Sequence, residues 1–319
     1  MRLSRRVTLT TLALVSCLTL AACGSSASDT STAPATGAAA SATSSEAAVS
    51  GEITVFAAAS LQKAYEEIAA AFTQAHPQAS ISFDFQGSQD LVAALDQGSA
   101  ADVLATANNS TMQDAIDKDL VGKPTEFATN ILTLIVPAGN PAGVTGLDSS
   151  LEGADLVICA VAVPCGEATA KLADELGVTL HPVSEEQKVT DVRGKVESGE
   201  ADAGIVYTTD AAAAKDKADK IDIPDGGVVN HYPIAQTASP ENAAGAKVFI
   251  DAVTGKTGQE VLAKYGFGKP GSAAAGASAG ASSSAGAGTA SSAAPSQAAT
   301  AGGSASPEAD KPTAETTAP

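Results

Sequence analysis

The chain has 319 residues, with 18 lysines and arginines against 36 aspartates and glutamates, for a formal net charge of −18. A chain this acidic, with no tryptophan and few other aromatic residues, lacks the basic surface and the stacking groups that nucleic-acid-binding proteins use. Its composition divides it into four parts: residues 1–22, 23–50, 51–270 and 271–319. Only residues 51–270 carry the apolar content that a folded core of one large or two small domains requires.

The chain begins with the features of an export signal. Three arginines lie within the first six residues, and a largely apolar run follows from Val7 to Ala22. That run is short for a membrane span, and it ends in the small pair Ala21-Ala22 directly before Cys23. A cysteine at this place resembles a bacterial lipobox, in which the thiol takes a diacylglycerol. We therefore expect a signal peptide at 1–22, lipidation of Cys23, and anchoring to the extracytoplasmic face of the cell membrane.

The two segments that flank the globular part are rich in small and polar residues. Residues 23–50 and 271–319 consist mainly of alanine, serine, threonine and glycine. Such segments cannot bury enough apolar surface to offset the entropy lost on ordering. We expect a flexible lipidated tether at 23–50 and a low-complexity, disordered tail at 271–319, for which no function is indicated.

The first half of the globular part alternates between strand and helix patterns. Short apolar strands are expected at 53–58, 81–85 and 102–106, and amphipathic helices at 60–76, 88–97 and 110–120. A long apolar strand without a following helix is expected at 127–137. The repeated order of strand and helix predicts a parallel sheet covered on both faces.

A second α/β set follows this long strand. We expect a strand at 156–159, a helix at 166–177, an irregular segment around 178–183, a helix opening at Asp191, and a strand at 203–207. An isolated strand at 229–235 and helices at 241–255 and 257–264 complete the chain. This order predicts an α/β fold of two lobes joined by two crossovers. Lobe 1 is expected at 51–131 and 232–270, and lobe 2 at 132–231. Ligands then bind in the cleft, at strand C-termini and helix N-termini.

The remaining cysteines, Cys159 and Cys165, lie in a chain expected to be exported, so a disulfide is the expected state. The alternatives are a reactive thiol or a metal site. The three histidines, His76, His181 and His231, have no metal-ligand spacing.

Four expected helix starts follow strands and offer backbone N–H groups or hydroxyls. They begin near Ser60, Ser88, Cys165 and Asp191. A helix N-terminus carries unpaired N–H donors and a partial positive charge, which makes it suited to anions even in an acidic protein. Taken singly, each serine and Asp191 fits a plain helix cap, and Tyr207 fits a buried core residue.

The combined motifs resemble those of the periplasmic molybdate-binding proteins of molybdate ABC transporters, over about residues 51–269. The segments that carry the resemblance are Val55–Leu61, Gly87–Leu91, Ala101–Ala107, Val163–Gly166, Asp191–Arg193 and Gly199–Tyr207. The resemblance implies a tetrahedral oxyanion held by the hydroxyls of Ser60, Ser88 and Tyr207 and by the backbone amides of Cys165 and Val192. It also implies contributions from the amides of Ala59 and Ser88. Many relatives have alanine at the position of Cys165, a change that leaves the backbone amide in place.

The resemblance implies a two-lobed periplasmic-binding-protein fold with two hinge crossovers. It also implies a binding protein without cofactor or catalytic residues. It would capture molybdate, and also tungstate, as an oxyanion rather than by direct metal ligation, and deliver it as a monomer to an ABC permease. Two alternatives stay open: a receptor for sulfate or another oxyanion, and an exported thiol enzyme that uses Cys165. The thiol chemistry requires a base, and His181 is the one histidine in the same lobe, with nothing in the sequence to place it nearby.

Overall fold

The computed structural model describes residues 49–272. The expected signal peptide, the lipidation site Cys23, most of the tether and almost all of the tail lie outside these residues. Ser50 already begins the first strand, so the folded part starts slightly before the expected boundary at residue 51. No helix within the described part of the chain has the length and apolar character that crossing a membrane requires.

Two five-stranded sheets form the framework, and the α/β fold class is confirmed. The first sheet has the order β2-β1-β3-β10-β4, in which β1 runs parallel to β2 and β3, and β10 runs antiparallel to β3 and β4. Its strands are β1 (Ser50–Ala58), β2 (Gln78–Gln86), β3 (Val103–Ala105), β4 (Thr125–Asn130) and β10 (Asn230–Gln236).

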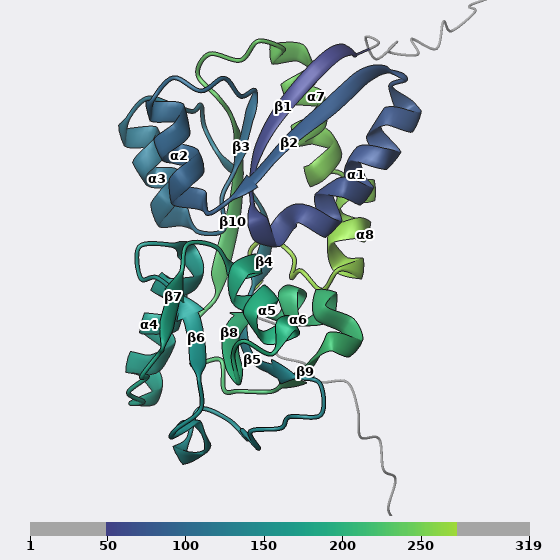
Figure 1. The fold of residues 1–319 in the computed structure, drawn as a ribbon. Helices are drawn as coiled ribbons and strands as arrows, with labels where there is room; N and C mark the ends of the chain where they lie inside the picture. The colour runs from purple at the N-terminus through teal and green to yellow at the C-terminus, as the bar shows by residue number, and fades with distance from the viewer. Residues whose placement is uncertain (1–48, 273–319) are drawn as a thin grey trace, which may run out of the picture. The chain divides into compact units, whose positions relative to one another are not determined.

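Helices cover both faces of this first sheet (Figure 1). On one face lie α1 (Gln62–Ala75), α7 (Ala243–Thr254) and α8 (Lys256–Lys264), and on the other lie α2 (Ser88–Asp96) and α3 (Asn109–Asp117). Alternation along β1 explains the two cores, because Val55 faces the first group of helices and Phe56 faces the second. The C-terminal helices therefore complete the half of the molecule that the N-terminal strands begin.

The second sheet has the order β7-β6-β8-β5-β9, with β6 parallel to β7 and β8, and β5 antiparallel to β8 and β9. It is built by β5 (Leu132–Pro137), β6 (Leu156–Cys159), β7 (Ser184–Glu186), β8 (Ala203–Tyr207) and β9 (Ala218–Ile221). Packed with it are α4 (Pro164–Leu176), α5 (Val189–Ser198) and α6 (Thr208–Ala214), and the short 3₁₀ turns η2 (Ser149–Leu151) and η3 (Lys215–Lys217) complete this half. The sequence patterns did not indicate α6 or β9.

The single long strand expected at 127–137 is wrong. The chain forms two strands, β4 in the first sheet and β5 in the second, separated by Ile131. The Asn130 side chain explains the break, because its Oδ1 accepts the Ile131 N–H at 3.0 Å and so withdraws that amide from strand pairing. This break is one crossover between the sheets. The segment between β9 and β10 is the other.

Candidate functional site

The two serines lie at helix starts in the first half but do not cap them. Ser60 lies in the 3₁₀ turn η1 (Ala59–Leu61), and its Oγ is 3.1 Å from the Tyr232 hydroxyl. Ser88 is the first residue of α2, after the N-cap Gly87, and its buried Oγ accepts the Ala107 N–H at 3.1 Å. Neither α2 nor η1 has a side-chain cap bond, so the plain capping alternative is wrong for both serines.

The N-terminus of α4 brings a backbone donor from the second half. Pro164 occupies the first turn, where its missing N–H costs nothing, and the amide of Cys165 follows among the first-turn groups that have no acceptor within the helix. Cys165 is bonded to Cys159 by a disulfide, as expected from the sequence. The loop packs tightly, since a Cβ at Gly166 would lie 1.8 Å from the carbonyl oxygen of Ala160.

The helix expected to open at Asp191 begins two residues earlier. Lys188 is the N-cap of α5, and Val189 is its first residue. Val192 therefore lies a full turn inside, where its N–H has a helical acceptor, and its side chain packs in the core near Gly204. Asp191 does not cap this helix, because it lies exposed in the first turn, as Asp90 does in α2. The free amide that faces the cleft at this point is that of Val189.

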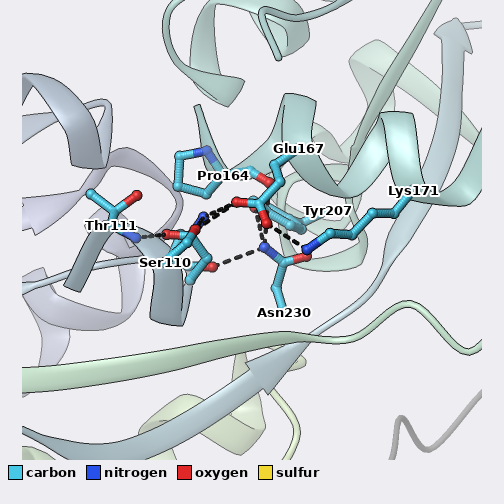
Figure 2. Close-up of polar contacts among 9 residues, drawn as sticks. Ser110, Thr111, Pro164, Glu167, Lys171, Tyr207 and Asn230 are labelled. Carbon is cyan, nitrogen blue, oxygen red and sulfur yellow. Dashed lines mark hydrogen bonds and ion pairs between the residues drawn. The ribbon is translucent and has the colours of Figure 1, made fainter. Parts of the chain in front are cut away.

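Tyr207 ends β8 and stands at the N-cap position of α6, with 1% of its surface exposed. Its hydroxyl accepts a hydrogen bond of 2.9 Å from Asn230 Nδ2 on β10, which Figure 2 shows. Burial, followed by the charges of Tyr232 and Asp210, raises the pKa of Tyr207 well above the ordinary value for tyrosine. The hydroxyl thus stays protonated and able to donate.

These groups enclose one small cavity of about 20 Å³ between the two sheets. Four of the five expected ligand residues line it, and Val189 takes the place of Val192. The lining residues include no aspartate or glutamate; they are Ala58, Ala59, Ser60, Gln86, Gly87, Ser88, Ala107, Val163, Pro164, Cys165, Gln187, Lys188, Val189 and Tyr207. A single water needs roughly 10–15 Å³ on this measure, so a five-atom oxyanion enters only when the two halves separate.

Larger hollows elsewhere have the wrong chemistry for an anion. One of about 670 Å³ is lined by Asp148, Glu152 and Asp155, and one of about 480 Å³ by Asp222 and Asp225 beside Lys220. Carboxylates repel a dianion, so the small cavity is the better candidate despite its size. Within residues 49–272 no cluster of three or more His, Cys, Asp or Glu side chains is arranged to hold a metal ion.

Direct contacts between the halves surround this cavity. Glu167 on α4 accepts from Asn108 Nδ2 at 2.7 Å and from Ser110 Oγ at 2.6 Å, both at the start of α3, and pairs with Lys171 one turn along α4 (Figure 2). We call Asn108, Ser110, Glu167 and Lys171 the mouth cluster. Burial alone would raise the pKa of Glu167, but the bonds from Lys171, Ser110 and Asn108 outweigh it and hold the pKa below the usual value.

Backbone also meets backbone across the cleft. A Cβ at Gly87 would lie 2.4 Å from the carbonyl oxygen of Gln187, so only glycine allows this approach. Gln89 Nε2 donates to the same carbonyl at 3.2 Å, and Lys188 Nζ lies 3.5 Å from Gln86 Oε1. Lys188 is therefore a cation on the wall of the cavity that the sequence motifs did not indicate.

Comparison with known proteins identifies the family of the chain. The family model described as "Bacterial extracellular solute-binding protein" matches residues 53–268. The Mycobacterium tuberculosis H37Rv protein named molybdate-binding protein ModA is 42% identical over 222 residues, covering 68% of this chain and 85% of that protein. The Escherichia coli K12 protein of the same name is 32% identical over 235 residues, covering 68% and 88%.

A solved structure supports the fold. The periplasmic molybdate-binding protein of Azotobacter vinelandii superposes with a TM-score of 0.61 at 19% identity, over 68% of this chain and 99% of that one. The relatives are solute-binding proteins and not enzymes. On these matches, the chain belongs to the family of bacterial extracellular solute-binding proteins, as its motifs indicated.

Proposed function

We propose that this protein is an extracytoplasmic receptor that captures molybdate, and also tungstate, as an intact oxyanion. The observation that carries the proposal is the composition of the cavity wall. Three hydroxyls and the first turns of η1, α2, α4 and α5 converge on a space that no carboxylate lines. The names of the relatives support molybdate as the anion.

The proposed ligand set is Ser60, Ser88 and Tyr207 through their hydroxyls, and Cys165 and Val189 through their amides, with Val189 replacing the expected Val192. The amides of Ala59 and Ser88, each the first residue of its helical turn, are further donors. Hydrogen bonds to a charged group contribute about 1.5–3 kcal/mol each. Five to seven of them are enough for a dissociation constant of about 1 μM, near −8 kcal/mol, after the cost of closure.

The same chemistry disfavours two alternatives. Hydrogen phosphate carries a proton that would find no carboxylate to accept it on this wall, and an unpaired buried donor is costly. A thiol enzyme requires a free Cys165, whereas its sulfur is bonded to Cys159. Sulfate is a fully deprotonated tetrahedral dianion like molybdate, so sulfate binding is an outcome that the experiment below must separate.

The two sheets with their helices act as lobes that close over the anion. We propose that the lobes are residues 51–131 with 230–270, and residues 132–229, hinged at Ile131 and at the return to β10. The expected boundary at 231/232 thus moves to the start of β10, because Asn230 and His231 already pair with β4 of the first sheet. Lipidation of Cys23 would hold this monomeric receptor at the outer face of the membrane, where the closed form delivers its ligand to an ABC permease. Export and the cysteine after Ala21-Ala22 are what support the anchor.

Calorimetry on the folded part of the chain, residues 49–272, tests the proposal. Molybdate, tungstate, sulfate and phosphate are titrated under one condition of pH and salt. We expect molybdate and tungstate to bind at micromolar or tighter concentrations and phosphate to bind far more weakly. Tight sulfate binding with weak molybdate binding would replace the proposed ligand, and no binding of any of the four would reject the oxyanion receptor.

A further inference from the structure

The oxygen of each hydroxyl on the cavity wall already accepts a hydrogen bond from another group of the protein. Ser88 Oγ accepts the Ala107 N–H at 3.1 Å. A backbone amide can only donate, so the direction of this bond is certain. The proton of Ser88 is therefore free to point into the cavity.

Tyr207 is arranged in the same way by Asn230. Asn230 Nδ2 lies 2.9 Å from the Ala107 carbonyl oxygen and 2.9 Å from the Tyr207 hydroxyl. The carbonyl can only accept, so it identifies this side-chain atom as the nitrogen, and both protons of the nitrogen are then used. The Tyr207 oxygen must accept this bond, so its own proton is left to donate, to a ligand in the cavity or to the neighbouring Tyr232 hydroxyl.

Ser60 is arranged through a chain of two residues. Asn130 Oδ1 accepts from the Ile131 N–H at 3.0 Å, which fixes the orientation of the amide and leaves Nδ2 to donate to Thr209 Oγ1 at 2.8 Å and to the Tyr232 hydroxyl at 3.5 Å. Tyr232 is fully buried, and its other bonded partner is Ser60 Oγ at 3.1 Å.

The direction of the bond between Tyr232 and Ser60 follows. Either hydroxyl could donate on geometry alone; because Asn130 Nδ2 can only donate to Tyr232, we assign the proton of Tyr232 to Ser60 Oγ. Burial raises the pKa of Tyr232 well above its ordinary value, which keeps that proton in place. The proton of Ser60 then turns toward the cavity.

We propose that Tyr232 and Asn230 are positioning residues that fix the direction of the hydroxyl protons, so that the cavity presents donors only and selects oxyanions that carry no proton. This inference rests on the proposed function. Neither residue belongs to the expected ligand set, and each acts through a hydroxyl that does: Tyr232 through Ser60, and Asn230 through Tyr207. Without them the hydroxyls can rotate and offer lone pairs as readily as protons.

The first experiment compares Tyr232→Phe, Ser60→Ala and the double variant by calorimetry with molybdate. Removing the Tyr232 hydroxyl should weaken binding about two- to tenfold, the range for one neutral hydrogen bond, while leaving the ring in its contacts with Phe127 and Phe267. Because Tyr232 acts through Ser60, the double variant should bind like Ser60→Ala alone. Losses that multiply in the double variant, or unchanged binding by Tyr232→Phe, would overturn the inference.

Tyr65→Phe is the matched control. Tyr65 is a buried tyrosine of the same half, and its hydroxyl has no hydrogen-bond partner in the described structure. Its removal should leave molybdate affinity unchanged. Melting temperatures of all variants without ligand identify any loss that comes from misfolding. If Tyr232→Phe does not fold, Asn230→Ala is compared instead with Tyr207→Phe and with their double variant, which should bind like Tyr207→Phe alone.

The second readout is selectivity, which a purely structural role would not change. Tyr232→Phe and Asn230→Ala should lower the ratio of molybdate to phosphate affinity at fixed pH, because a freed hydroxyl can accept the proton of hydrogen phosphate. An equal loss of affinity for both anions would contradict proton direction as the cause. If the unaltered protein binds neither anion, the proposed function fails. If the unaltered protein binds molybdate but both variants keep its ratio of molybdate to phosphate affinity, only this inference is rejected.

Discussion

The wall of the cavity and the mouth of the cleft join the two halves by opposite chemistry. The wall carries hydroxyls, backbone amides and Lys188 but no carboxylate, so in the proposed receptor its contribution to closure requires an anion. The mouth cluster requires no bound anion, because the carboxylate of Glu167 itself accepts hydrogen bonds from Asn108 and Ser110 of the other half. Closure thus has one component that depends on ligand and one that does not. Substitutions on the wall and at the mouth separate these two components of closure.

The largest effect is expected on the wall. Ser60→Ala and Ser88→Ala each remove a donor to a charged ligand and should weaken molybdate binding by about 1.5–3 kcal/mol, roughly ten- to a hundredfold. Ser88→Ala also leaves the Ala107 N–H without its acceptor, so a lower melting temperature is expected for that variant. Calorimetry measures the affinity, and Ser80→Ala, at the exposed far end of β2, is the control. Unchanged affinity in both serine variants would mean that the site lies elsewhere.

Next in size is the disulfide behind the wall. It closes a short loop, so replacing Cys159 and Cys165 together by serine should lower the free energy of unfolding by about 2 kcal/mol. Affinity should fall as well, because the amide of Cys165 lies on the wall. Chemical unfolding and calorimetry measure the two effects. Mass spectrometry of non-reduced peptides should show the link in the unaltered protein, and two alkylatable thiols there would count against it.

A smaller effect is expected at the mouth. Glu167→Gln keeps the shape but removes the charge, and should weaken molybdate binding only a few-fold. The lowered pKa of Glu167 means that its contribution to closure is present above the pKa of the open form and is lost as the pH falls through the pKa of the closed form. The ratio of unaltered to Glu167→Gln affinity should therefore fall toward one at acidic pH, and this ratio cancels the protonation of the ligand. Glu175→Gln, exposed on the same helix, should give a ratio of one at every pH.

The smallest effect on binding is expected at Asp210, which is buried and lies 3.3 Å from Arg193 Nη1. Burial raises the pKa of Asp210 to about 7, although Arg193 opposes the shift. A raised carboxyl pKa gives stability that is present below the unfolded pKa and is lost as the pH rises through about 7. The melting temperature of the unaltered protein, minus that of Asp210→Asn, should therefore decrease as the pH rises from about 4 to about 7. Asp210→Asn should bind molybdate with the same affinity as the unaltered protein. A constant difference over that range would contradict the shift.

The sequence predicted the parts of the fold that depend on local periodicity. Strand β6 and strand β8 lie where the apolar runs placed them, and the helix expected at 166–177 is α4, which begins two residues earlier, at Pro164. The break at Ile131 was not predicted, because 127–137 is mostly apolar and the break comes from a side-chain bond of Asn130, one of its few polar residues. Only the tertiary structure decides that the two parts of this run join different sheets.

The candidate site also combines residues that local sequence motifs indicate with residues that only the tertiary structure brings in. The motifs indicated the hydroxyl residues that line the cavity, but they indicated Val192 where Val189 lines it. The start of α5 was placed by the acidic residue Asp191 rather than by its buried positions. Val189, Val192 and Val196 are all buried, a helical spacing that indicates a start at Val189. Asn230 and Tyr232 had no local signal, because their role depends on β10 pairing between β3 and β4.

The close approach of Gly87 to the Gln187 carbonyl has a consequence for the time that a ligand stays bound. Any larger side chain at residue 87 would hold the halves apart, since its first carbon would overlap that oxygen. The donors of the open first half would still meet an incoming anion at nearly the same rate. What such a receptor loses is its ability to enclose the anion, so dissociation becomes faster while association changes little. In the proposed receptor, we therefore expect the absence of a side chain at Gly87 to lengthen the residence time of the ligand.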